Sequence, residues 1–262
     1  MRALILLTGT VAAFLFLAFQ SPSETRASRP SIRVAPLAVS AETIATEAPG
    51  DLVVVRYDAN DVTEGNAQPV RIDGPGSGNC SISDSYCRGM REGSANAVCP
   101  VSIVDACDGA SLLRSEPGNK VAPTRLGLEF RRYSTPAPCA IFEDVFLPNY
   151  AFKQVCDPFA PDYEGASKVM LLPIVLELCN GSCEVTVTDI GIFFLEGFSE
   201  ESGALHCSGN NCEFHVRFAG TLLTGAGRPA CGVHMLQRIG VPPGRGCRGG
   251  NGTSDQQRAT SD

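Results

Sequence analysis

The sequence predicts a mainly antiparallel β domain with long, disulfide-stapled loops, with an α+β fold as the alternative. Three observations support this prediction: apolar and polar residues alternate in several short runs, no long window shows a clear 3.6-residue period, and the chain contains 12 cysteines. The 262 residues are 44% hydrophobic, which is enough for a buried core and excludes a wholly disordered chain. The net charge is -7 and Lys and Arg form no cluster, so we do not expect nucleic acid as a partner.

Five runs have the patterns of β-strands. Leu52–Tyr57 is rich in Val and lies between turn-forming residues. Lys168–Cys179 is almost continuously apolar, as expected for a strand covered on both faces. The other three runs alternate between apolar and polar residues, which predicts strands with one buried face. They are Arg125–Arg132, Glu184–Thr188 and Glu213–Phe218.

The residues after Glu184–Thr188 predict the central strand of the sheet. Ile190, Ile192 and Phe194 alternate with residues that are themselves mostly apolar or glycine. A strand with two apolar faces is covered on both sides, and its glycines allow neighbouring elements to approach closely.

The N-terminus is predicted to direct export. Arg2 is followed by an uncharged, mostly apolar run to Phe19, whose length lies between that of a secretory signal and that of a spanning helix. Residues 1–19 therefore form a cleaved signal peptide or an uncleaved signal anchor. We also expect a flexible linker at 20–50, a β domain at 51–241 with a cysteine-rich loop lobe at about 72–116, and a flexible tail at 242–262.

The cysteines predict disulfides, because thiols pair in the oxidising compartments to which exported proteins go. Two pairs flank short turns of Asn, Gly and Ser, across which a bond is sterically reasonable: Cys179 with Cys183, and Cys207 with Cys212. The sequence leaves the pairing of the others open. They are Cys80, Cys87, Cys99, Cys107, Cys139, Cys156, Cys231 and Cys247.

No motif points to catalysis, a cofactor or a metal. His206, His215 and the Cys207/Cys212 pair are residue types found in zinc sites, but no second distant pair accompanies them, so disulfides are favoured. His215 lies on the outward face of its predicted strand, where a solvated surface role is expected. The chain has no G-x-S-x-G, H-E-x-x-H or Walker motif. We therefore predict no catalytic residue, no cofactor and no metal site.

One part of the chain resembles a known family. Val169–Val175, the Cys179–Cys183 turn, Val185–Phe198 and Cys212–Phe218 follow one another as they do in the C-terminal region of TadG-like proteins of Flp (Tad) pilus assembly. Pro117-Gly118-Asn119 resembles a turn that often precedes this region. The apolar run to Phe19 lacks the acidic residue usual in that family's N-terminal helix. The resemblance places an aromatic core strand at Gly191, Phe193, Phe194, Gly197 and Phe198.

The resemblance implies a non-enzymatic protein of the bacterial cell envelope, outside the cytoplasm. It would assist pilus assembly or adhesion by presenting a sheet edge or a cysteine-stapled loop to protein partners. The N-terminal segment would contact the membrane if it stays uncleaved. Two alternatives remain: a secreted, disulfide-rich binding module without a pilus role, and an exported hydrolase or redox enzyme.

Overall fold

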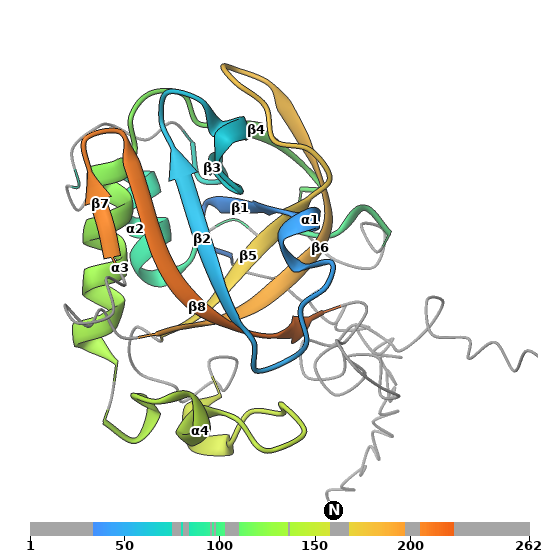
Figure 1. Ribbon diagram of the computed structural model, residues 1–262, viewed down its shortest axis with the longest axis vertical. Helices are drawn as coiled ribbons and strands as arrows, with labels where there is room; N and C mark the ends of the chain where they lie inside the picture. The colour runs from blue at the N-terminus through green and yellow to red at the C-terminus, as the bar shows by residue number, and fades with distance from the viewer. Residues whose placement is uncertain are drawn as a thin grey trace, which may run out of the picture.

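The computed structural model describes residues 34–74, 80, 84–94, 96, 98–102, 110–135, 137–157, 168–196 and 205–222 (Figure 1). The elements in these ranges are β1 (Leu37–Ser40), α1 (Ala41–Ile44), β2 (Leu52–Asp58), η1 (Val62–Glu64), β3 (Ala67–Arg71), α2 (Ser85–Glu92), β4 (Leu112–Ser115), α3 (Val121–Ser134), η3 (Ala137–Cys139), α4 (Phe142–Val145), η4 (Gln154–Cys156), β5 (Val169–Val175), β6 (Glu184–Leu195), β7 (Leu205–Ser208) and β8 (Asn211–Thr221).

The strands form one sheet, part of which closes on itself. The order of the strands is β2-β8-β6-β4-β3-β1-β5, and β7 pairs with β8. Because β5 also pairs with β6, the strands β6, β4, β3, β1 and β5 form a closed ring, from which β8, β2 and β7 extend. Only the β1–β5 pair is parallel among the strand pairs of the described residues. The prediction of a mainly antiparallel β fold is therefore confirmed.

Strand β6 lies at the centre of this sheet. It pairs with β5 along one edge, and with β4 and then β8 along the other. Ile192 and Phe194 belong to one buried apolar cluster, whereas Phe193 and Leu195 belong to a second one. Both faces of β6 are covered, as its apolar pattern predicts.

Helices and loops cover the two apolar clusters. We call the cluster that contains Phe193 the α3-side core, because it includes side chains of α2 and α3, among them Tyr86, Met90 and Leu128. We call the cluster that contains Phe194 the α4-side core, because it includes Phe142 and Phe146 from the segment around α4. Figure 1 shows α2 and α3 together at one side of the sheet and α4 below it.

A β-bulge keeps Val187 and Ile190 of β6 in the same core. Val187 and Ile190 both face the α4-side core, although strict alternation would place them on opposite faces. The register with β5 shifts between Ile174, which lies opposite Asp189, and Val175, which lies opposite Val187. The extra residue in β6 restores the correct face for the apolar residues that follow.

The strand predicted at Arg125–Arg132 is wrong, because this segment lies in helix α3. The buried residues Thr124, Gly127, Leu128 and Arg131 recur at helical spacing, whereas Leu126, assigned to the inner face of a strand, is 41% exposed. A run of eight residues can fit both periods, and here packing against α2 favours the helix.

The linker predicted at residues 20–50 is also wrong where the structure describes it. Leu37–Val39 in β1 is fully buried and pairs with both β3 and β5. The chain then turns, and the Ser40 hydroxyl accepts a hydrogen bond from the Glu42 amide at the start of α1. A strand of four residues offers too short an apolar run to be recognised against its Ser- and Pro-rich surroundings. The domain thus begins before residue 51.

The segment predicted as a loop lobe at 72–116 contains regular structure in its described parts. Helix α2 begins after Asp84, whose carboxylate accepts a hydrogen bond from the Cys87 amide at 2.7 Å. At the other end of the segment, β4 joins β3 to β6. This lobe therefore contributes one strand to the ring and one helix to the α3-side core.

Candidate functional site

Four disulfides are resolved within the described ranges. They are Cys80–Cys87, Cys139–Cys156, Cys179–Cys183 and Cys207–Cys212, with Cα–Cα distances of 5.2, 5.5, 6.4 and 3.9 Å. Cys99 is also disulfide-bonded, and Cys107, Cys231 and Cys247 lie outside the described residues. Both bonds expected from the short turns are present. Disulfides in this number indicate an oxidising, extracytoplasmic environment.

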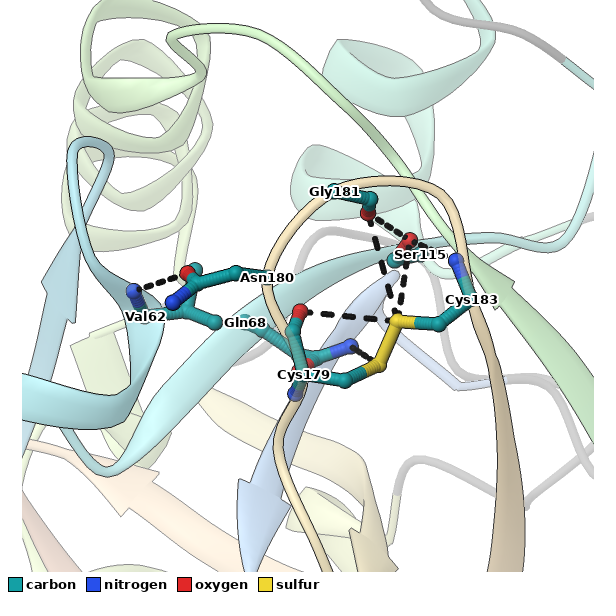
Figure 2. Close-up of a disulfide and its surroundings, with 7 residues drawn as sticks. All are labelled: Val62, Gln68, Ser115, Cys179, Asn180, Gly181 and Cys183. Carbon is teal, nitrogen blue, oxygen red and sulfur yellow. Dashed lines mark hydrogen bonds between the residues drawn. A yellow bond between two sulfur atoms is a disulfide. The ribbon is translucent and has the colours of Figure 1, made fainter.

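The Cys179–Cys183 turn, which joins β5 to β6, is held by side chains from β3 and β4 (Figure 2). The buried Gln68 amide accepts a hydrogen bond from the Cys179 backbone N–H at 2.7 Å. The Ser115 hydroxyl accepts one from the Cys183 N–H at 3.0 Å and donates one to the Gly181 carbonyl. The turn is thus fixed both by its covalent bond and by the closed ring beneath it.

Asn180, at the exposed end of this turn, connects it to η1. Its side-chain oxygen accepts a hydrogen bond from the Val62 N–H at 2.9 Å, and its side-chain nitrogen donates to Asp61 at 2.7 Å. Hydrogen bonds from Thr63 and from Asn180 lower the pKa of the Asp61 carboxyl, because they stabilise its charged form. Figure 2 shows the Asn180 amide directed at Val62.

A groove lies between this turn, α1 and η1. It has a volume of about 430 Å³. We call it the β5 groove, because the chain that follows β5 forms one of its walls. Its lining residues are Ser40, Glu42, Thr43, Thr63, Gly65, Asn66, Leu176, Glu177 and Leu178. Residues distant in sequence meet here because β1 and β5 are paired and the disulfide turn is bound to η1.

A second cavity near η1 is lined by polar and charged residues. It has a volume of about 390 Å³ and is lined by Arg56, Asp58, Glu64, Ser208, Asn211 and Glu213. Arg56 and Glu213 form an ion pair across β2 and β8, with Nε and Oε2 separated by 2.8 Å. This cross-strand pair occupies the cavity wall and contributes little stability, because Arg56 is exposed and Glu213 is only half-buried.

The Pro117–Asn119 turn lies against the hairpin that carries the Cys207–Cys212 bond. The Asn119 side-chain nitrogen donates to the Gly209 carbonyl at 2.9 Å, and its oxygen accepts from the Val121 N–H at the start of α3. Two features of the resemblance to TadG-like proteins, a Pro-Gly-Asn turn and a cysteine-containing turn, are therefore neighbours in space. The contact is structural: it orients α3 against β7 and β8.

Buried charged and hydroxyl groups also hold the Pro117–Asn119 turn. The Glu116 carboxylate forms ion pairs with Arg71, whose Nε lies 2.6 Å from Oε2, and with Lys120, whose Nζ lies 3.3 Å from Oε1. The Tyr57 hydroxyl donates to the Gly118 carbonyl and accepts from the Lys120 N–H, both at 3.2 Å. Burial raises the pKa of Tyr57. These groups satisfy one another, which favours a structural role for the cluster.

The aromatic residues named by the resemblance lie partly in β6. Phe193 and Phe194 are fully buried on its opposite faces, and Gly191 lies in the same strand two residues before Phe193. A Cβ at Gly191 would come within 2.3 Å of the Phe193 ring, so the packing of that ring depends on glycine at this position. Gly197 and Phe198 lie outside the described residues.

The residues considered for zinc are not gathered as metal ligands. Cys207 and Cys212 are bonded to each other, so neither is available as a thiolate. His215 lies in β8 opposite Val54, and His206 lies in β7 opposite Glu213 of β8. Within the described part of the chain, no three His, Cys, Asp or Glu side chains form a group that would hold a metal ion.

None of the helices in the described ranges has the length and apolar character needed to cross a membrane. Comparison with known proteins returned no matching family model, no matching curated protein and no matching solved structure.

The β5 groove is the feature that the sequence did not predict. We expected one strand over Lys168–Cys179, whereas β5 ends at Val175, where its partner β1 ends and turns into α1. The groove combines residues from α1, η1 and the end of β5. The only signal in the sequence was Glu177, a charge inside a run assigned to a buried strand.

Proposed function

We propose that this protein is a non-enzymatic binding protein of the bacterial cell envelope, in the role of a TadG-like accessory of Flp pilus assembly or adhesion. The resemblance over Pro117–Phe218 and the predicted export segment support this proposal. The disulfides support the location outside the cytoplasm.

The observation that carries the binding role is the fixed turn beside an open groove. The Cys179–Cys183 bond, Gln68 and Ser115 hold the turn rigidly against the ring. Preorganised surfaces bind partners with less loss of conformational entropy than flexible ones. A clamped turn next to a cavity of about 430 Å³ has the geometry of a binding surface for a protein partner.

The pilus role is tested by deleting the gene in its own bacterium and counting Flp pili on the cell surface. We expect fewer pili, restored by the wild-type gene. Restoration should be weaker with a Gln68→Ala gene, which removes the hydrogen bond to the Cys179 N–H, than with a Leu126→Ala control, which changes an exposed residue of α3. Unchanged pilus numbers after deletion would reject the pilus role and favour the secreted binding module.

Export is tested separately by thiol labelling. Full-length protein taken from cells and denatured without reduction should react with almost no maleimide, whereas protein lacking residues 1–19 should be retained in the cytoplasm and react. Free thiols in the full-length protein would contradict export.

A further inference from the structure

The chain that follows β5 forms an unpaired edge in the β5 groove. The parallel pairing of β1 with β5 ends at Ser40 and Val175, where the chain of β1 turns into α1. In the described part of the chain, Leu176, Glu177 and Leu178 make no backbone hydrogen bond. Successive residues of an extended chain direct their N–H and C=O groups to opposite edges, so alternate groups of this segment face the position that β1 has left and are open there to an incoming chain.

The lining of the groove states what kind of chain would fit. Leu176 is 67% exposed, which makes it an apolar contact without a partner in the described structure. Glu42 and Glu177 are both exposed carboxylates, and no Lys or Arg is among the lining residues. A second copy of this chain, whose net charge is -7, is electrostatically disfavoured there. A cationic segment is favoured.

We propose that the β5 groove binds an extended, basic segment of a partner protein, which adds as a strand beside Leu176–Leu178. Its backbone pairs with that edge, its Lys or Arg side chains lie by Glu42 and Glu177, and an apolar side chain covers Leu176. This mode is β-strand addition, in which backbone hydrogen bonds supply affinity and alternate side chains supply specificity. The inference rests on the proposed binding function and adds the chemistry of the partner.

The test uses a fluorescein-labelled hexapeptide of alternating Lys and Val and the oxidised protein, with binding followed by fluorescence anisotropy. Leu176→Asn should weaken binding about tenfold, since it removes the apolar side chain that the bound peptide covers and adds no charge. The double variant Glu42→Lys/Glu177→Lys should weaken it by at least as much. An N-methylated peptide, which lacks alternate backbone donors, should bind at least tenfold more weakly.

Matched controls separate the groove from the overall charge. Leu126→Asn introduces the same change on α3, where Leu126 is 41% exposed. Glu92→Lys/Glu129→Lys makes the same change in net charge on α2 and α3, where these side chains are 54% and 40% exposed. In Figure 1 these helices lie on the side of the sheet away from α1. Both controls should bind the peptide as the wild type does. Hydrogen exchange should slow at residues 176–178 when peptide is added.

Three results would overturn the inference: equal losses in groove and control variants, binding unaffected by N-methylation, or dimers of the free protein that disappear in Leu176→Asn. The last would make a second copy the occupant. If the peptide does not bind but the protein is exported and deletion still reduces the number of pili, the inference fails and the proposed function stands. If the peptide binds in the groove but deletion leaves the number of pili unchanged, only the pilus role is rejected.

Discussion

Replacing Phe194 by Ala tests the central position of β6. The side chain is fully buried, its ring meets Phe142 edge-on at a centroid distance of 5.7 Å, and the Lys168 ammonium lies 5.5 Å from the ring centre. Truncating a buried Phe costs about 3–5 kcal/mol, to which the lost aromatic pair contributes about 0.5–1.5 kcal/mol. We expect a loss of about 4 kcal/mol, a large part of the roughly 5–15 kcal/mol by which domains are stable.

The assay is urea unfolding of the oxidised protein followed by far-ultraviolet circular dichroism, because the chain has no Trp for fluorescence. Phe194→Leu keeps most of the volume and should cost about 1.5 kcal/mol or less, so it stays measurable if Phe194→Ala does not fold. His215→Ala, on the polar face of β8, should change stability by about 0.5 kcal/mol or less. A Phe194→Ala protein within about 1 kcal/mol of the wild type, with the same urea dependence, would refute burial of β6 on both faces.

Three further predictions use other parts of the structure. Gly127→Ala should destabilise the protein, although Ala favours helices by about 1 kcal/mol, because its Cβ would lie 2.4 Å from the Met90 Cβ; a rise in stability on urea unfolding would contradict this packing. Replacing Cys139 and Cys156 by Ser should lower the free energy of unfolding by roughly 3 kcal/mol in the same assay, and replacing Cys207 and Cys212 by roughly 2 kcal/mol. The first loss is larger because the Cys139–Cys156 bond closes the longer loop. The reverse order would disagree with the chain-entropy model. In a nuclear magnetic resonance pH titration, Thr63→Val should raise the pKa of Asp61 more than Asn180→Ala does. Since folding lowers the pKa of Asp61, the stabilisation from this carboxylate is present at neutral pH and is lost as the pH falls through the lowered pKa. An unchanged pKa of Asp61 in both variants would show that these hydrogen bonds do not cause the shift.

Local pattern was sufficient for the strands that dominate the sheet. The strands β2, β5, β6 and β8 coincide with runs whose alternation or continuous apolarity predicted strands. The short cysteine-flanked turns at Cys179–Cys183 and Cys207–Cys212 were likewise predictable, because their spacing brings the two Cα atoms within bonding range in almost any reversal.

Elements whose structure depends on distant partners were not predictable. The short β1 is a strand because β3 and β5 pair with it, and α3 is a helix because Gly127 and Leu128 pack against α2 and the sheet. In both segments the local signal is too short to exclude the alternative.

The sequence by itself determined a β-rich, disulfide-bonded domain, because periodicity and cysteine spacing are local properties of the chain. Only the tertiary structure decided that the sheet closes into a ring through β5 and β6, and that β1 turns away where β5 continues. The β5 groove exists for that reason: its walls come from three segments, residues 40–43, 63–66 and 176–178, that are brought together by strand pairing over more than a hundred residues, a contact that no local pattern encodes.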